Sequence, residues 1–298
     1  MQYSLTPTLY RTLDINTLNM KTLKRTIALA ALVLLTGFAA LAQRPTAATG
    51  ATTVHGPEKG SLVIIGGGTV VPEIWDRFID LAGGSNARIV VITNASGETD
   101  DFHNATITEL QKRLGADRVT PMNLKNIVEA NDPALIAPLT KATGIYFTGG
   151  RQWRISEVYL NTLAHQAMWD LLERGGVIAG SSAGASIQGS LLWRGDTAGP
   201  DILIGDHTQG LGFMKYTAID QHILVRNRQH DLRDFINAAP MFIGIGIDES
   251  TAIEVHGDTF TVVGKSYVAV HFKGQNDFKF LRAGQKFDLC CRELIKSE

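Results

Sequence analysis

The sequence predicts an α/β domain in which a mostly parallel sheet carries helices on both faces, with an antiparallel hairpin near the C-terminus. Short continuous apolar runs alternate with stretches of helical periodicity, which is typical of strands buried on both faces of a parallel sheet. Thirty glycines against nine prolines provide for many tight turns between strands and helices. Two strand-like runs near the C-terminus flank a short turn, and this pattern predicts the hairpin.

The first expected unit runs from a strand through a glycine turn into a helix. Residues 62–65 are Leu-Val-Ile-Ile, Gly66-Gly67-Gly68 follows, and Pro72 opens a stretch with apolar residues at helical spacing. The same alternation of strand and helix repeats along the chain. The expected elements are strands at 88–93, 144–147 and 177–179, helices at 106–114 and 155–172, and a hairpin of strands 251–255 and 259–263 around His256-Gly257-Asp258.

Composition excludes several classes of protein and of partner. The 298 residues are 44% hydrophobic and 19% charged, enough for a full core and unlike a disordered or fibrous chain. With 28 basic and 29 acidic residues and no block of like charge, we expect no nucleic-acid partner.

Cys290 and Cys291 are adjacent and form no CxxC pair, so no metal site or cofactor is predicted. His55 and His103 lie in polar loop sequence, and we expect them to be exposed and without a role.

The N-terminus has the pattern of a secretion signal. Three basic residues precede an apolar run, Ile27–Ala42, that ends in the Ala-x-Ala pattern recognised by signal peptidase. A retained membrane anchor is the alternative, but the run is shorter than the roughly 20 residues that a span needs. We therefore expect a periplasmic or secreted protein with no membrane span after processing. Its parts would be a signal peptide over 1–42, a flexible lead-in over 43–60 and a single catalytic α/β domain over 61–298.

A candidate nucleophile lies in Gly180-Ser181-Ser182-Ala183-Gly184, which has the G-x-S-x-G form directly after a predicted strand. Glycine neighbours let the chain fold tightly around a serine on a sharp strand-to-helix turn. The backbone N–H of Ala183, at the start of the following helix, could then donate to an oxyanion. The bare pattern arises by chance in a glycine-rich chain, and the preceding strand favours a nucleophilic Ser182 over a purely structural turn.

A serine hydroxyl needs a positioned base, normally a histidine that a carboxylate orients. His222 is the candidate base because it lies in the dense polar segment 220–228, just past the apolar end of a predicted strand. Asp248 and Glu249 follow the apolar run 242–247, where a loop at a sheet edge could reach His222. Spacing alone leaves open the alternative that both acids cap a turn and that the nearby arginines form a solvated face.

Together these motifs resemble those of the cyanophycinase-like serine peptidases of family S51, relatives of aspartyl dipeptidase. The resemblance covers roughly Leu62 to Val270. The similar segments, in chain order, are Gly66-Gly67-Gly68, Phe147-Thr148-Gly149-Gly150-Arg151-Gln152, the Ser182 motif, Asp220-Gln221-His222 with Arg226 and Arg228, and Gly246-Ile247-Asp248-Glu249.

The resemblance implies a fold like that of class I glutamine amidotransferases and a triad of Ser182, His222 and Glu249. The α/β-hydrolases use a different chain order, which here could only be built as Ser182, Glu249 and His271. The family also implies an oxyanion hole and a substrate pocket, and it implies no metal or cofactor. The oxyanion hole falls on Ala183, Gly149 and Gly150, and the pocket on Gln152, Asp220, Gln221, Arg226 and Arg228.

The implied reaction is hydrolysis of β-aspartyl bonds, as in cyanophycin, through an acyl-enzyme. A β-linked aspartyl unit has a free α-carboxylate, and the guanidinium forks of Arg226 and Arg228 suit such a group. Cyanophycinases carry a third arginine where this chain has Asp231, so an exported aspartyl or isoaspartyl dipeptidase is an alternative, since Asp231 could attract a substrate ammonium group.

Two further alternatives are an esterase of the α/β-hydrolase type and a catalytically silent protein that binds acidic peptides. The resemblance also implies a homodimer.

Overall fold

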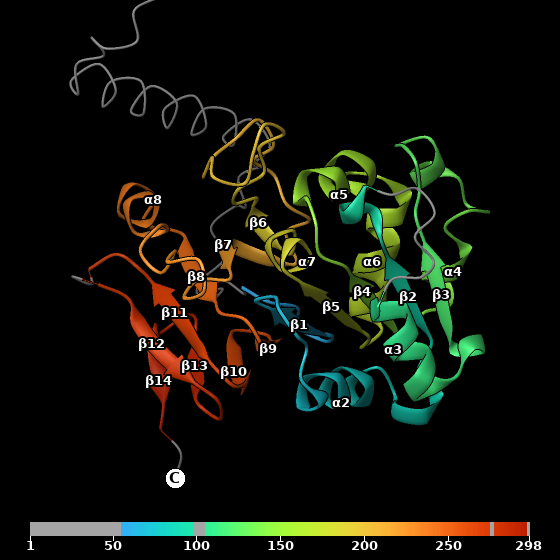
Figure 1. The fold of residues 1–298 in the computed structure, drawn as a ribbon, viewed down its shortest axis with the longest axis horizontal. Helices are drawn as coiled ribbons and strands as arrows, with labels where there is room; N and C mark the ends of the chain where they lie inside the picture. The colour runs from blue at the N-terminus through green and yellow to red at the C-terminus, as the bar shows by residue number, and fades with distance from the viewer. Residues whose placement is uncertain (1–54, 98–104, 275–276, 297–298) are drawn as a thin grey trace, which may run out of the picture. The chain divides into compact units, whose positions relative to one another are not determined.

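The computed structural model describes residues 55–97, 105–274 and 277–296. The expected signal peptide and most of the expected lead-in lie outside the described residues. Two sheets and their covering helices confirm the α/β class (Figure 1). None of the helices within the described ranges combines the length and the apolar character that crossing a bilayer requires.

The larger sheet joins a parallel part to an antiparallel part. Within the described residues its strand order is β14-β13-β10-β9-β1-β5-β4-β2-β3. The strands from β1 to β3 in this order run parallel, whereas β9 pairs antiparallel with β1 and leads through β10 to β13 and β14. The strands are β1 (Ser61–Ile65), β2 (Ile89–Ile92), β3 (Val119–Met122), β4 (Gly144–Phe147), β5 (Val177–Ser181), β9 (Thr251–His256), β10 (Thr259–Gly264), β13 (Lys286–Asp288) and β14 (Glu293–Ile295).

A second, smaller sheet has the strand order β12-β11-β8-β7-β6. Strands β6, β7 and β8 run parallel, and β11 and β12 continue the sheet in antiparallel fashion. The sequence predicts that late short strands extend the edge of one sheet. Instead β11 and β12 pair with β8, so the late strands are divided between two sheets. The strands are β6 (Gly189–Leu191), β7 (Met214–Gln221), β8 (Ile243–Ile247), β11 (Tyr267–His271) and β12 (Lys279–Arg282).

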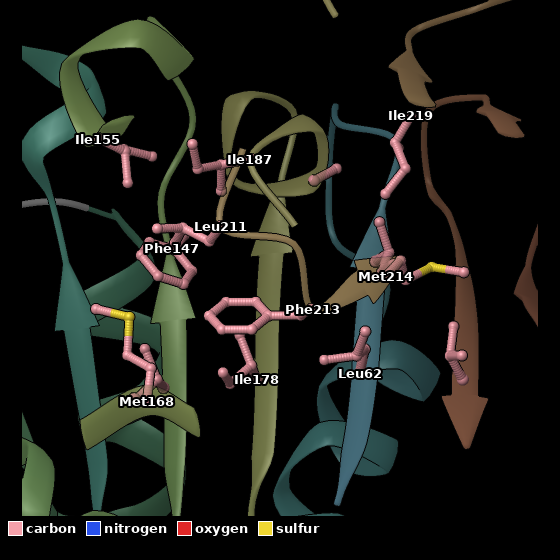
Figure 2. Packing of buried hydrophobic residues seen from close by; sticks show 14 of the residues in the cluster. Leu62, Phe147, Ile155, Met168, Ile178, Ile187, Leu211, Phe213, Met214 and Ile219 are labelled. Carbon is pink, nitrogen blue, oxygen red and sulfur yellow. The ribbon is translucent and has the colours of Figure 1, made fainter. Parts of the chain in front are cut away.

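Helices cover both faces of the parallel strands because successive side chains of each strand point to opposite faces. Val63 and Ile65 of β1 pack with the apolar side of α2, while Leu62 and Ile64 belong to the core on the other face. Figure 2 shows this second core, with Leu62 beside residues of β4, β5 and α6. The helices are α2 (Pro72–Leu81) and α3 (Ala105–Leu114) on the first face, α4 (Ala137–Lys141), α5 (Gln152–Tyr159), α6 (Leu163–Glu173) and α7 (Ala183–Ser186) on the second, and α8 (Arg233–Ala238) beside the smaller sheet.

One expected helix is divided in two. The apolar periodicity predicts a continuous helix over 155–172, but α5 and α6 are separate. Asn161 between them has a left-handed backbone (φ 59°). Thr162 then caps α6, because its hydroxyl accepts a hydrogen bond from the His165 N–H at 3.2 Å. The other predicted strands and helices and the hairpin are confirmed to within two residues at each end.

Residues 55–60, predicted as part of the flexible lead-in, are packed against the domain. His55 is only 6% exposed, and the N–H of Gly56 donates to the Gly257 carbonyl at 3.0 Å. The chain is therefore already packed against the β9–β10 turn at His55, and the expectation that His55 is exposed is wrong. His103 lies outside the described residues.

Candidate active site

Two pairs of parallel strands end close together, and their carboxyl ends carry the predicted triad. In the larger sheet Ile65 of β1 pairs with Ser181 of β5, and in the smaller sheet Gln221 of β7 pairs with Ile247 of β8. Parallel neighbours present their carboxyl ends at the same sheet edge, where α/β proteins commonly bind ligands. The residues that follow these strand ends are therefore the ones that meet.

Ser182 occupies a strained turn between β5 and α7. Its backbone has φ 57° and ψ −107°, a conformation that a residue with a side chain rarely adopts. Its N–H donates to the carbonyl of Ile65 at 3.0 Å. The glycines of the motif allow the turn to be this tight, because a Cβ on Gly180 would lie 2.2 Å from the carbonyl oxygen of Gly184.

His222 follows β7 and reaches the serine. Its N–H donates to the Gly66 carbonyl at 3.0 Å, and its Nε2 lies 2.8 Å from the Oγ of Ser182. The imidazole packs directly on the backbone of Gly67, where a Cβ would lie 2.2 Å from the ring carbon Cε1. The glycine turn after β1 therefore supports the histidine ring by direct packing.

Glu249 completes the arrangement, because its Oε1 lies 2.6 Å from the Nδ1 of His222. The next residue, Ser250, donates its N–H to the Gly67 carbonyl at 2.9 Å. Three consecutive carbonyls at the end of β1 therefore hold the three segments that carry Ser182, His222 and Glu249. The structure brings these three side chains into one hydrogen-bonded series.

The two neighbouring acids have different roles. Asp248 is 5% exposed, and its Oδ1 accepts the N–H groups of Leu224 and Val225 at 2.9 and 3.2 Å. Its Oδ2 accepts a hydrogen bond from the Ser266 hydroxyl at 2.6 Å. Asp248 therefore fixes the loop after His222, whereas Glu249 contacts the imidazole itself. Spacing left turn capping and histidine orientation as alternatives. In the structure Asp248 makes the contacts of a turn cap, and Glu249 makes the contact that orients the histidine.

The environment of His222 favours the neutral imidazole. Burial lowers its pKa below the ordinary value of 6.5, the hydrogen bond to Glu249 opposes this, and the guanidinium charges of Arg226 and Arg228 lower the pKa further. A neutral imidazole can accept a proton from Ser182, which is what a general base must do near neutral pH.

His271 does not fit the alternative chain order of an α/β-hydrolase triad. It lies at the end of β11, is 4% exposed, and stacks beside Phe278. Burial lowers the pKa of His271 to about 4. The carboxylate of Glu249 is hydrogen-bonded to His222. The geometry therefore favours the order Ser182, His222, Glu249.

The three residues expected to form an oxyanion hole are not equally well placed around Ser182. Ala183 is the first residue of α7, and the first N–H groups of a helix have no acceptor within the helix. Gly149 lies next to the serine, since a Cβ on it would be 3.5 Å from the Cβ of Ser182. Gly150 instead packs on the Ala95 carbonyl, 2.1 Å from where its Cβ would be. Ala183 and Gly149 are thus the better placed pair.

The arginine pair lies on the loop after His222. Arg226 is exposed, and its N–H donates to the His222 carbonyl at 2.9 Å. Arg228 is only 8% exposed; its guanidinium donates to the Oε1 of Gln221 at 3.3 Å and lies 3.9 Å from the carboxylate of Asp201. Burial lowers the pKa of Arg228, as does the neighbouring charge of Arg194. A buried guanidinium with such weak partners is suited to bind an anion.

Gln152 and Asp220 are buried, and their side chains make hydrogen bonds within the protein. Gln152 is 2% exposed and donates to the carbonyls of Trp193 and Arg194 at 2.8 and 2.9 Å. Asp220 is fully buried, and its carboxylate is occupied by Trp193, Arg194 and the N–H of Gln221. The expectation that these two side chains contact substrate stays a prediction, and the structure shows that both make hydrogen bonds within the protein.

Arg194 is the residue that sequence reasoning missed. It is 2% exposed, has a left-handed backbone (φ 57°), and pairs with both Asp220 and Asp231. Asp231 is thus ion-paired with a buried guanidinium that it shares with Asp220. No local motif surrounds Arg194 in the sequence, and its only signal is that an arginine follows a short apolar run, Leu191–Trp193.

Comparisons with known proteins agree with the motifs. The family model described as Peptidase family S51 matches residues 62–263. A cyanophycinase of Synechococcus elongatus is 31% identical over 226 residues, which cover 74% of this chain and 70% of that protein. A cyanophycinase of Geminocystis herdmanii is 29% identical over 219 residues, covering 71% of this chain and 80% of the relative. The crystal structure of a peptidase from an acI-B1 Actinobacterium has a similar fold, with a TM-score of 0.58 and 23% identity over 78% of this chain and 98% of that one.

Proposed function

The chain belongs to peptidase family S51 and is a serine-type peptidase, and we propose that it hydrolyses bonds made through the β-carboxyl group of aspartate. The observation that carries this proposal is the hydrogen-bonded series from Ser182 through His222 to Glu249. The names of the curated relatives supply the substrate class, because cyanophycinases act on cyanophycin.

The proposed mechanism passes through an acyl-enzyme. The Nε2 of His222 takes the proton of Ser182, and the serine Oγ attacks the β-carbonyl carbon of the aspartyl unit. Glu249 stabilises the imidazolium, while the N–H groups of Ala183 and Gly149 receive the oxyanion. His222 then gives the proton to the departing amine, and water attacks the ester by the same steps in reverse to release the acid and free Ser182.

Recognition of the substrate rests on the arginine pair. A β-linked aspartyl unit keeps its α-carboxylate next to the scissile carbonyl, so a cation is needed close to the serine. Arg226 and Arg228 are near enough to His222 to lower its pKa, and Arg228 has only weak partners within the protein. We assign the α-carboxylate to Arg228, whose planar guanidinium can hold it with two hydrogen bonds.

The dipeptidase alternative now has less support. It relied on Asp231 as an unpaired anion for a substrate ammonium group, and that carboxylate pairs with Arg194. Free dipeptides and polymer nevertheless share the β-aspartyl bond. Both remain within the proposed substrate class, and the length of the natural substrate is decided by experiment.

The test compares the wild-type chain with Ser182→Ala on cyanophycin, β-Asp-Arg, β-Asp-Leu and α-Asp-Leu, with products identified by mass spectrometry. We expect cleavage of β-linked substrates only, and its loss in the variant. Products released from cyanophycin would indicate a polymer-degrading enzyme, and cleavage of free dipeptides alone would indicate a dipeptidase. Preference for α-Asp-Leu, or full activity of Ser182→Ala, would refute the proposal.

We also propose that the protein is exported, on the strength of the N-terminal pattern alone. Fractionation of producing cells, followed by N-terminal sequencing, tests this. A chain that begins near Gln43 outside the cytoplasm is the expected result, and an uncleaved chain inside the cytoplasm contradicts it. The homodimer stays a prediction.

A further inference from the structure

A second polar cluster lies at the far end of strands β1 and β9 from the triad. A ring nitrogen of His55, a carboxylate oxygen of Asp258 and the Sγ of Cys290 all lie within 4.8 Å of one another. The three residues come from the entry segment before β1, the turn between β9 and β10, and the segment after β13. Thr251, at the other end of β9, accepts the Gly66 N–H beside the triad, and β9 spans about 17 Å.

The backbone around this cluster is fixed by hydrogen bonds between the three segments. Two of them join the entry segment to the β9–β10 turn: the Gly56 N–H donates to the Gly257 carbonyl at 3.0 Å, and the Gly257 N–H donates to the Pro57 carbonyl at 2.8 Å. The N–H of Leu289 donates to the carbonyl of Asp258 at 2.8 Å, which places Cys290 beside the turn. The three side chains are therefore held together before any ligand arrives.

The Asp258 side chain already contacts the entry segment and lies close to the cysteine. Its Oδ1 accepts the backbone N–H of His55 at 2.5 Å, and a carboxylate oxygen lies within 4.8 Å of the Sγ of Cys290. The Nδ1 of His55 lies 3.1 Å from the carbonyl of Lys215. A histidine that binds a metal through one ring nitrogen commonly donates the other N–H to such a carbonyl, which fixes the ring and its tautomer.

We propose that His55, Asp258 and Cys290 form a binding site for a zinc ion. One imidazole, one carboxylate and one thiolate are the three ligand types that zinc accepts together, whereas calcium and magnesium select oxygen ligands. Tetrahedral zinc with bonds of about 2.0 to 2.3 Å holds its ligand atoms roughly 3.3 to 3.8 Å apart, so small side-chain rotations bring this cluster to that geometry. Because Cys290 is exposed, water from solvent fills the fourth position.

Binding replaces the thiol proton of Cys290 with the metal ion and releases that proton to solvent. The bound ion would join both ends of the folded domain, the entry at residue 55 and the segment at residue 290, to the β9–β10 turn. A ligand that binds only the folded chain stabilises it, so we expect zinc to raise the melting temperature. The expected effect is on stability, and it does not depend on the proposed peptidase reaction.

The adjacent cysteine provides a matched control. Cys291 is also exposed, but its N–H is bound to Asp288 at 2.7 Å and its side chain is not part of the cluster. We therefore compare the purified full chain with Cys290→Ser, Cys291→Ser and Asp258→Asn. The measurements are zinc titration by calorimetry, with zinc chloride alone, and the absorption spectrum after addition of cobalt.

The wild-type chain is expected to bind one zinc ion and, with cobalt, to show the near-ultraviolet charge-transfer band of a thiolate ligand. Cys290→Ser loses that band and binds zinc at least about tenfold more weakly, which is the loss seen even when only an outer partner of a ligand is removed. Cys291→Ser retains both. The triad has no thiol, so metal binding at His222 cannot produce the band.

Absence of stoichiometric zinc binding by the wild-type chain overturns the proposal. So does zinc binding that Cys290→Ser leaves unchanged, or a cobalt band that disappears in Cys291→Ser and persists in Cys290→Ser. Replacing an exposed cysteine by serine is not expected to unfold the chain, and melting curves without metal check this. Asp258→Asn keeps the shape of the carboxylate and must also weaken zinc binding.

Discussion

The two ends of strands β1 and β9 carry polar clusters that the chain assembles in different ways. At the catalytic end, consecutive backbone carbonyls of Ile65, Gly66 and Gly67 hold the three segments of the triad. At the opposite end, side chains add to the backbone hydrogen bonds between the segments, because the Asp258 carboxylate accepts the His55 N–H and the His55 ring contacts the Lys215 carbonyl. The difference teaches that exchanges of triad side chains act on catalysis, whereas exchanges at the other end act on stability alone.

The largest expected effect is the loss of the base. His222→Ala removes the proton acceptor for Ser182, and we expect kcat to fall on the order of 10⁵-fold. His222 is itself buried and hydrogen-bonded, so its removal should also cost about 1–3 kcal/mol of stability. His55→Ala should destabilise the chain by a similar amount, because it deletes another buried hydrogen-bonded ring, but it should leave kcat unchanged.

Kinetic assays and thermal denaturation of the two histidine variants check this difference. A loss of kcat in His55→Ala as large as that in His222→Ala would break the distinction between the two ends.

Adding a methyl group to the glycine turn is expected to cause the next largest loss of rate. Gly67→Ala places a Cβ within 2.2 Å of the His222 ring, at a backbone φ of 116°, so the ring must move. A displacement of about 1 Å typically costs on the order of 10²-fold in rate. The control is Gly257→Ala at the opposite end, which also has a positive φ (56°) but an open position for its Cβ.

Gly257→Ala should lower the free energy of unfolding by about 1–2 kcal/mol, because alanine is strained at a positive φ. It should leave kcat unchanged. Equal rates for both alanine variants would mean that the glycine turn does not support the histidine.

A smaller effect concerns substrate recognition. Arg228→Lys keeps the charge but loses the planar fork, so kcat/KM for a β-aspartyl dipeptide should fall about 10- to 100-fold, mainly through KM. The same peptide with its α-carboxylate converted to an amide is the control, because the wild-type and variant enzymes should cleave it at similar low rates. If the variant loses activity equally on both peptides, Arg228 does not bind the carboxylate.

The smallest expected effect is a shift in the pH profile. The pKa of His222 is lowered mainly by burial, so the acid limb of kcat/KM, where the imidazole is protonated, should have its midpoint below pH 6.5. Arg226 is one of the charges that lower this pKa. Arg226→Gln should therefore raise the pKa and move the acid limb to higher pH, and a shift to lower pH would contradict the assigned environment.

The catalytic end could be predicted from the sequence because each of its segments has a local chemical signature. The G-x-S-x-G turn, the histidine after a strand and the acids after another strand each lie where a parallel strand ends. What remained open was the choice between Asp248 and Glu249, which depends on side-chain direction. The division of the late strands between two sheets was also missed, because periodicity does not specify strand partners.

The zinc-binding cluster could not be predicted in the same way. His55, Asp258 and Cys290 have no ligand spacing in the chain, and His55 lies in a segment whose composition indicates a flexible lead-in. Arg194 was missed for a related reason, since only its burial against Asp220 and Asp231 shows its importance. Such groupings are set by tertiary packing rather than by any local motif.

The most direct test of the account is covalent labelling by a fluorophosphonate, a reagent that reacts with activated serines, with the modified peptide located by mass spectrometry. The motif contains two serines, and only Ser182 has its Oγ 2.8 Å from His222. We predict a single adduct on Ser182, retained in Ser181→Ala and abolished in His222→Ala. An adduct on Ser181, or labelling of Ser182 that persists without His222, would contradict the proposed triad.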